Sequence, residues 1–147
     1  MIKIREMTAA DVPQVAALEK ECFRDPWSEK SIAEELDHEY SLWLVAVEND
    51  QVLGYVGSQT AMWETDMMNI AVAPSRRREG LGNILVTELI RELRNRGSNS
   101  LALEVRVSNE PAKALYESLG FHQVGLRKNY YRNPKEDALI LRKEWGV

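Results

Sequence analysis

The chain has 147 residues, of which 44% are hydrophobic and 29% are charged, and its formal net charge at pH 7 is −4. This composition is typical of one folded domain and excludes an intrinsically disordered chain. The acidic balance argues against direct binding to nucleic acid or to a membrane surface, because both kinds of binding need a surplus of Lys and Arg.

The amino-terminal segment predicts a strand followed by two helices. Residues 2–6 alternate apolar and charged side chains, as a half-buried strand does. Thr8 or Asp11 can cap a first helix, whose apolar residues follow helical spacing. Residues 25–28 interrupt that helix, and Ser28 is the expected cap of a second, short helix.

The pattern then changes to the period of β-strands. Residues 41–48 and 51–59 are rich in strand-forming residues, and the hairpin signal Asn49-Asp50 separates them. A third run, residues 66–73, ends at a proline. We therefore expect three consecutive strands in this part of the chain.

The second half alternates helices and strands. Residues 81–96 form the clearest helix, with leucine and isoleucine at helical spacing and Gly97 at its expected end. A strand, a helix and two strands follow, expected at residues 101–107, 109–119, 121–127 and 138–142. Helices placed between strands favour an α/β fold whose mixed sheet is covered on both faces. No linker or repeat interrupts this order, so we expect a single domain, residues 1–147.

Two further features concern the compartment. The chain has one cysteine, Cys22, which cannot form an intramolecular disulfide. No apolar run approaches the ~20 residues of a membrane span, and the amino terminus lacks the pattern of a signal peptide. We therefore expect a cytoplasmic protein.

A glycine-containing segment between a strand and the clearest helix predicts phosphate binding. Gly80 and Gly82 allow the backbone to approach a ligand closely. The start of the following helix carries unpaired N–H groups and a partial positive charge. Arg76, Arg77 and Arg78 add cationic charge beside it. From local chemistry alone, an ordinary strand-to-helix turn with solvated arginines explains the segment equally well.

The spacing Arg77-x-x-Gly80-x-Gly82, after a strand that ends in a proline, resembles the acetyl-CoA signature of the GNAT superfamily. The resemblance covers essentially the whole chain. It implies the GNAT fold, a mixed and mostly antiparallel seven-stranded sheet with helices on both faces. It also implies an acetyl-CoA site in which a pantetheine arm lies along the strand near residue 70 and a pyrophosphate lies on the amides before the helix. The residues implied are Ile70, Ala71, Val72, Arg77, Arg78, Glu79, Gly80, Leu81, Gly82, Asn83 and Asn109.

A second set of blocks resembles the RimI subfamily of that superfamily. The blocks are Asn69-Ile70-Ala71-Val72, Pro26-Trp27-Ser28, residues 101–109, residues 114–121 and Asn129-Tyr130-Tyr131 ahead of Glu136-Asp137-Ala138. Members of this subfamily acetylate the amino-terminal alanine of ribosomal protein S18, so the resemblance implies that a basic ribosomal protein is the acceptor. Departures from the family pattern are small, and they leave the peptide preference open.

Glu104 is the candidate general base. An amino-terminal amine has an unperturbed pKa near 8, so a group must accept its proton before or during attack on a thioester. Glu104 is a carboxylate in an otherwise apolar strand and faces the opposite side from Leu101 and Leu103. The residues alone leave open an ion pair with Arg106 or with a neighbouring strand. The resemblance implies the catalytic role.

Tyr116 is the candidate acid for the departing CoA thiolate. It follows Asn109 by seven residues, two helical turns or about 10.5 Å along one face. Asn109 can therefore meet the CoA arm while Tyr116 reaches the sulfur. A buried aromatic beside Leu115 and Leu119 is the alternative, and the resemblance implies the acid.

These residues predict direct transfer in a ternary complex. We expect a ping-pong route through Cys22 to be disfavoured, because we expect Cys22 to lie far from the cofactor segments. No pattern of ligands indicates a metal. The resemblance places Tyr130 and Tyr131 in a hairpin loop over the peptide amino terminus, with Pro26 and Trp27 in the facing loop.

The acidic segment at residues 29–39 has two interpretations: a rim that attracts a basic peptide, or a solvated helix face. Two other functions also stay open. One is acetyl transfer to a lysine side chain or a small-molecule amine. The other is a non-catalytic module that binds acetyl-CoA. We expect a monomer or a weak dimer.

Overall fold

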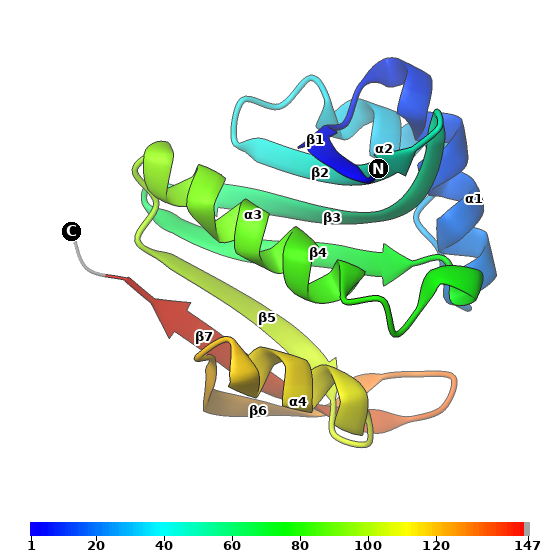
Figure 1. Ribbon diagram of the computed structural model, residues 1–147. Helices are drawn as coiled ribbons and strands as arrows, with labels where there is room; N and C mark the ends of the chain where they lie inside the picture. Colours follow the sequence, from blue (N-terminus) through cyan, green and yellow to red (C-terminus); the bar gives the residue numbers. More distant parts are fainter. Residues whose placement is uncertain (146–147) are drawn as a thin grey trace.

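The computed structural model describes residues 1–145, and its centre is one mixed β-sheet (Figure 1). Within these residues the sheet has seven strands: β1 (Lys3–Glu6), β2 (Ser41–Glu48), β3 (Gln51–Ala61), β4 (Glu64–Val72), β5 (Ser100–Arg106), β6 (His122–Tyr131) and β7 (Glu136–Glu144). The strand order is β1-β2-β3-β4-β5-β7-β6, and every neighbouring pair is antiparallel except β4 and β5. The predicted mixed, mostly antiparallel α/β sheet is confirmed.

Four α-helices lie among residues 1–145: α1 (Val12–Cys22), α2 (Glu29–Glu35), α3 (Leu81–Asn95) and α4 (Glu110–Ser118). Ser28 caps α2 by accepting a hydrogen bond from the N–H of Ser31 at 3.0 Å, as the sequence predicts. Gly97 follows the end of α3 with a positive φ of 93°, the conformation that favours glycine after a helix. None of the helices in this part of the chain combines the length and apolar character of a membrane span.

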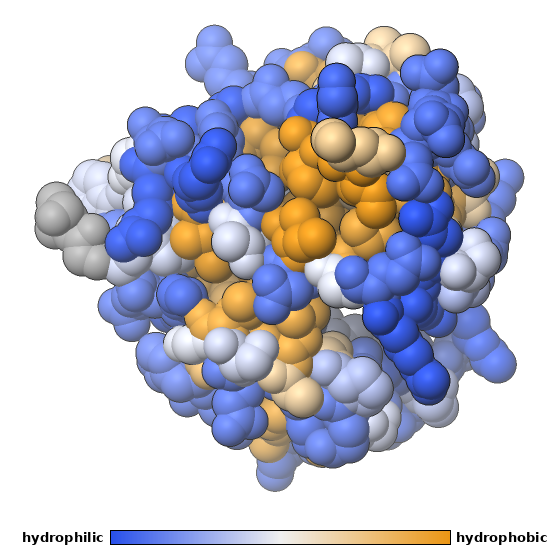
Figure 2. Space-filling view, viewed as in Figure 1, coloured by the Kyte–Doolittle hydropathy of each residue, from blue (hydrophilic) through white to orange (hydrophobic). Residues whose placement is uncertain are grey.

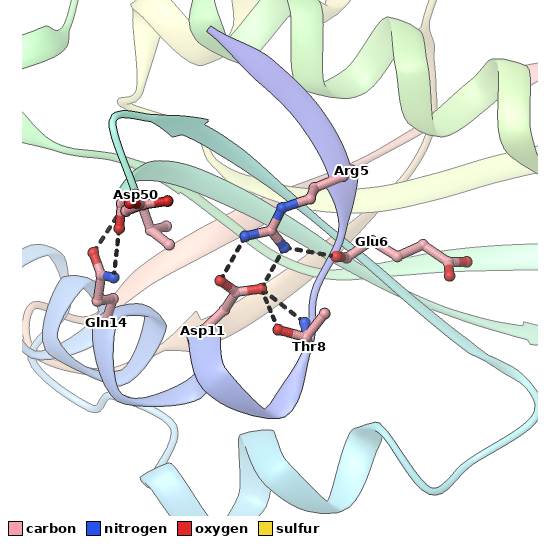
Figure 3. Close-up of polar contacts among 7 residues, drawn as sticks. Arg5, Glu6, Thr8, Asp11, Gln14 and Asp50 are labelled. Atoms are coloured by element: carbon pink, nitrogen blue, oxygen red, sulfur yellow. Dashed lines mark hydrogen bonds and ion pairs between the residues drawn. The ribbon is translucent and has the colours of Figure 1, made fainter.

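Asp11 determines where α1 begins (Figure 3). One of its carboxylate oxygens accepts hydrogen bonds from the main-chain N–H and the hydroxyl of Thr8, at 2.8 and 3.0 Å. Arg5 of β1 donates to both carboxylate oxygens at 2.6 and 2.9 Å and holds the pKa of Asp11 below its ordinary value. Thr8 is therefore the N-cap residue of a short 3₁₀ turn, Ala9–Asp11, and Asp11 is the N-cap residue of α1, although its side chain makes no capping hydrogen bond to that helix.

Helices cover both faces of the sheet, although not equally (Figure 1). α1 and α2 pack on one face of β2, β3 and β4, in a cluster that includes Val15, Ile32, Trp43, Val45 and Tyr55. α3 and α4 pack on the other face, in a larger cluster that includes Leu85, Leu89, Leu101, Leu103, Tyr116 and Leu141. The face of β5, β7 and β6 that lies opposite α4 has no helix of residues 1–145 packed on it.

Several predicted boundaries were displaced. β4 begins at Glu64, before the predicted residue 66, because its first residues pair with β5 across the sheet. The strand predicted at residues 121–127 continues to Tyr131, because β7 supplies a partner that the local sequence does not reveal. The hairpin turn at Asn49 and Asp50 is as predicted, and both residues have positive φ, 51° and 64°.

Candidate active site

The sheet opens between β4 and β5. These strands pair over only three residues each, 64–66 with 100–102, and then part (Figure 1). β4 stays paired with β3 as far as Val72, and β5 stays paired with β7 as far as Arg106. The space between them is a cavity of about 510 Å³, lined from its two sides by residues 67–70 and 103–106. A cavity of this size suits a small ligand or an extended arm of a larger one.

A β-bulge in β4 shapes one wall of this cavity. Residues 57–58 of β3 pair with Asn69 and Met67 of β4, so Met68 lies outside the ladder. A bulge bends the strand and redirects its main-chain groups. Beside it, the N–H of Ile70 donates to the side-chain oxygen of Asn69 at 3.1 Å. This is the strand segment that the sequence predicts to bind a pantetheine arm.

The segment before α3 has the geometry of an anion cradle. Gly80 is the N-cap residue of α3 and has a left-handed φ of 81°. No side chain makes a capping hydrogen bond at this end of the helix. A Cβ at Gly80 would meet nothing within 4 Å, so the space in front of the helix is open. In Figure 2 the side chains at the right-hand edge, where this segment lies in Figure 1, are strongly hydrophilic. The free N–H groups of the first helical turn can therefore meet a phosphate.

The three arginines of this segment do not contribute alike. Arg76 donates to Glu48 and to Glu79, both at 2.9 Å, so its charge is neutralised by two carboxylates. The prediction that Arg76 adds charge to the cradle was therefore wrong. Arg77 and Arg78 are exposed, and Arg78 has a positive φ of 68° that turns the chain toward Gly80.

Among the other predicted cofactor residues, Ala71 and Leu81 are buried in the core, so their side chains are not available to a ligand. Val72 accepts a hydrogen bond from the Arg77 guanidinium at its main-chain oxygen, at 3.3 Å. Gly82 lies under Leu115 of α4, where a Cβ would approach that side chain to 3.3 Å. Asn83 is exposed on the first turn of α3.

Glu104 lies on the predicted face of β5 and lines the cavity. Burial raises the pKa of its carboxyl, and the charge of Asp66 acts in the same direction. Arg127 opposes them: its Nε lies 3.3 Å from Glu104 Oε1, and it reaches across from β6. The cross-strand ion pair that the sequence left open is therefore present, while Arg106 pairs with Glu136 at 3.3 Å.

Tyr116 of α4 also lines the cavity and is buried, with 5% of its surface exposed. Its hydroxyl approaches the Met67 sulfur at 3.8 Å, and its ring packs edge-on against Phe121. Burial raises the pKa of this hydroxyl well above its ordinary value, so Tyr116 keeps its proton at neutral pH. The side chain of Asn109 caps α4 by accepting a hydrogen bond from the N–H of Ala112 at 3.1 Å. Asn109 also lines the same cavity.

Tyr130 and Tyr131 also line the cavity, but they belong to the end of β6 rather than to a loop. The guanidinium carbons of Arg127 and Arg106 lie 5.5 and 4.3 Å from the ring centres of Tyr130 and Tyr131, respectively. Burial raises the pKa of Tyr131 to about 12, and the nearby Glu104 charge adds to the effect. These contacts hold both rings beside the candidate base.

The structure does not bring Pro26 and Trp27 to the cavity. The Trp27 ring packs edge-on against Trp43 of the core, with ring centres 5.4 Å apart. The part of this loop that lines the cavity is residues 22–25, just before the predicted pair. Residues 22–25 carry no pattern that would have distinguished them in the sequence.

Cys22 lies beside the cofactor segments, so the prediction that it lies far from them was wrong. Its sulfur is 3.8 Å from the main-chain oxygen of Val72 and 3.5 Å from a guanidinium nitrogen of Arg77. The end of α1 packs across the end of β4, and this contact joins residues that are 50 positions apart in the chain. Burial raises the pKa of the Cys22 thiol, which keeps it protonated and poorly nucleophilic.

The acidic segment at residues 29–39 is not one surface. Glu35 is buried, and its carboxylate accepts hydrogen bonds from Ser41, Trp43 and Gln59. Glu34 and Asp37 are exposed, but α2 does not line the cavity. Among residues 1–145, no group of three or more His, Cys, Asp and Glu side chains could hold a metal ion.

Comparison with known proteins gives consistent results. The model of the acetyltransferase (GNAT) family matches residues 12–121. The [ribosomal protein bS18]-alanine N-acetyltransferase of Escherichia coli (strain K12) is 39% identical over 143 residues, which are 96% of this chain and 96% of that protein. The protein of the same name from Haemophilus influenzae is 36% identical over 141 residues, 94% of this chain and 95% of that protein.

The crystal structure of the ribosomal-protein-S18-alanine N-acetyltransferase from Escherichia coli superposes with a TM-score of 0.92 and 38% identity. The match covers 100% of this chain and 96% of that one. The likeness therefore extends over the sheet and both helical layers.

Proposed function

The chain belongs to the GNAT family of acetyltransferases, and we propose that it moves the acetyl group of acetyl-CoA to the amino-terminal alanine of ribosomal protein bS18. The observation that carries this acceptor is the 39% identity, over 96% of the chain, to a relative named for that reaction. We also propose that residues 1–147 form one acetyltransferase domain. A ribosomal protein as acceptor favours a cytoplasmic location.

The residues present fit acetyl-CoA. The first turn of α3 offers main-chain N–H groups to a pyrophosphate, with Gly80 leaving the approach open and Arg77 and Arg78 supplying charge. The edge of β4 that parts from β5 has main-chain groups at residues 70–72 for an extended arm to pair with, as another strand would. An arm in this position would bring the acetyl group to the cavity between Glu104 and Tyr116.

Glu104 is suited to remove a proton from the acceptor amine. Its raised pKa makes it a stronger base than an exposed carboxylate, while the guanidinium of Arg127 favours its ionised form. The amine nitrogen can then attack the thioester carbon directly. Main-chain N–H groups of residues 70–72 are the candidates to stabilise the oxygen of that carbonyl as charge develops on it, although the N–H of Ile70 would first have to leave the Asn69 side chain.

Tyr116 is suited to protonate the departing thiolate. It keeps its proton at neutral pH because burial disfavours the phenolate, and it lines the same cavity as Glu104. A covalent route through Cys22 is disfavoured for the same electrostatic reason, since its buried thiol stays protonated. These charge states support direct transfer in a ternary complex.

The test of the acceptor uses three peptides with acetyl-CoA, and it measures the release of free CoA thiol. The first peptide has the bS18 amino-terminal sequence, the second is the same peptide with a blocked amino terminus, and the third has a blocked terminus and an internal lysine. We expect turnover only with the first. Equal turnover of the third peptide would overturn the α-amine assignment, and binding of acetyl-CoA without turnover of any amine would favour a non-catalytic module.

A further inference from the structure

Glu19 of α1 is a carboxylate buried completely inside the protein, with 0% of its surface exposed. Three donors surround it. The main-chain N–H of Trp27 donates to Oε1 at 2.8 Å, the side-chain amide of Asn69 donates to Oε2 at 2.6 Å, and the hydroxyl of Tyr55 donates to the same oxygen. These donors come from three segments: the loop after α1, β4 and β3.

Among residues 1–145, no Lys, Arg or His forms an ion pair with Glu19. Burying a carboxylate without a cation is unfavourable, and burial accordingly raises the pKa of Glu19. A glutamine of the same length would avoid the charge. It could not accept all three hydrogen bonds, however, because its amide nitrogen would face donors. The carboxylate is therefore the side chain that can hold all three segments together.

Two of these segments contribute to the lining of the cavity. Residues 22–25, just before Trp27, line it, and so do residues 67–70 of β4. The bond to β4 continues further, because the Asn69 side chain that donates to Glu19 also accepts from the N–H of Ile70. A continuous chain of hydrogen bonds thus runs from the loop, through Glu19, to the main chain of the β4 bulge.

We propose that Glu19 is a positioning residue that fixes the loop at residues 22–27 relative to the bulge of β4. The inference rests on the proposed function, in which β4 holds the acetyl donor and the loop borders the acceptor. Attack of an amine on a thioester needs the reacting atoms within about 3–3.5 Å, and a displacement of about 1 Å can cost on the order of 100-fold in rate. Glu19 sets this alignment without touching either substrate.

Glu35 provides a matched control. It is also a buried glutamate of an amino-terminal helix, 5% exposed, and it accepts hydrogen bonds from side chains of β2 and β3. Burial acts to raise the pKa of Glu35, but its donors hold the pKa below its ordinary value. Neither Glu35 nor any of its donors lines the cavity. A purely structural role would make the two residues equivalent in activity assays.

The experiment compares Glu19→Gln with Glu35→Gln in the full chain, and it measures the melting temperature, kcat, and KM for acetyl-CoA and for the bS18 peptide. We expect both variants to lose stability. We expect Glu19→Gln to lose about 10- to 100-fold in kcat, with KM for acetyl-CoA changed less, while Glu35→Gln keeps kcat within about twofold. Equal kcat losses in the two variants would overturn the proposal.

A double variant that exchanges the carboxylate and the amide between positions 19 and 69 tests whether the lost kcat can be recovered. In Glu19→Gln/Asn69→Asp, the amide of residue 19 can donate to a carboxylate at residue 69, which can still accept from the N–H of Ile70. We expect the double variant to recover most of the kcat lost by Glu19→Gln, and Asn69→Asp alone to be impaired by two adjacent carboxylates. Absence of recovery in a folded double variant would contradict the proposal. Should Glu19→Gln not fold, Asn69→Ala replaces it, and a wild-type kcat would then overturn the proposal.

Hydrogen exchange separates this inference from the proposed function. We expect Glu19→Gln to speed exchange of the main-chain amides at residues 23–27 and 69–72, and Glu35→Gln to leave them protected. Unchanged exchange in Glu19→Gln would overturn the positioning role, whatever the substrate is. A wild-type protein that acetylates no amine would instead overturn the proposed function and leave the exchange result standing.

Discussion

The two halves of the sheet differ in how they are covered. β2 and β3 have nearly continuous runs of buried residues, because α1 and α2 pack on one face and α3 packs on the other. β5 alternates buried and half-buried residues, and β6 is exposed over most of its length. Such alternation is expected of strands with one face in the core and one face toward solvent.

This difference determines where the chemistry can occur. Carboxylates that project onto the covered half from the helices are buried, as Glu19 and Glu35 are. Glu104 lies on the open face of β5, where it is desolvated enough to have a raised pKa and still open to an acceptor. The covered half supplies a rigid support, and the half-covered part supplies the reactive group.

The largest expected effect tests the reactive group of the open face. We expect Glu104→Gln to lower kcat by about 10²- to 10⁴-fold, the usual contribution of a general base, or about 3–5.5 kcal/mol in activation free energy. The change leaves the melting temperature nearly unaltered, since Glu104 pairs only across the surface with Arg127. Steady-state kinetics with the bS18 peptide measures the effect.

Glu64→Gln is the matched control, because Glu64 is an exposed carboxylate at the start of β4 that pairs with Arg142. It should retain near wild-type kcat. A similar loss in the two variants would show that general charge on this face, rather than the base at Glu104, accounts for the rate.

The next effect tests the covered half. Leu85 of α3 is 0% exposed, and we expect Leu85→Ala to cost about 2–5 kcal/mol of unfolding free energy, through lost burial and the cavity that remains. Leu126 of β6 is 46% exposed, so Leu126→Ala should cost less than about 0.5 kcal/mol. Urea denaturation measures both, and equal costs would mean that the two halves do not differ in packing as described.

A smaller effect concerns Tyr116, which lines the same cavity as Glu104. Tyr116→Phe keeps the ring that packs on Phe121 and removes only the hydroxyl, so stability should change little. We expect kcat to fall by about 10²-fold, near the lower end for general acid catalysis. Tyr40→Phe, at an exposed tyrosine that stacks on His38, is the control. Unaltered kcat in Tyr116→Phe would assign the proton to another donor.

The smallest effect is a displacement of the pH profile. The charges that bear on Glu104 are Arg127 of β6, which lowers its pKa, and Asp66 of β4, which raises it, while Tyr131 of β6 is neutral at working pH. Activity needs the ionised carboxylate, so kcat/KM falls as the pH drops through this pKa. Removing the positive charge in Arg127→Gln should therefore move the acidic limb of the profile to higher pH.

Arg142→Gln is the control for this displacement, because Arg142 lies on the same face and pairs with Glu64 and Glu144 rather than with Glu104. The acidic limb of the kcat/KM profile of Arg142→Gln should stay in place. A limb that stays in place in Arg127→Gln as well would mean that Glu104 is not the group whose ionisation limits the rate.

The sequence predicted the order of elements and the strongest site residues because these depend on local properties. The alternation around Glu104 places it on the face opposite Leu101 and Leu103, and burial follows that alternation. The cap at Ser28 and the glycine after α3 need only neighbours a few residues away. Local pattern also located the segment before α3, where Gly80 adopts the left-handed conformation that its position requires.

The tertiary structure decided everything that depends on residues far apart in the chain. It placed Cys22 against Val72, paired Glu104 with Arg127, and enclosed Glu19 among donors from three segments. It also turned Trp27 into the core and neutralised Arg76. The periodicity of a sequence reports which side of an element a residue occupies. Which charges and donors meet that side depends on the packing of other elements, and the local pattern does not contain it.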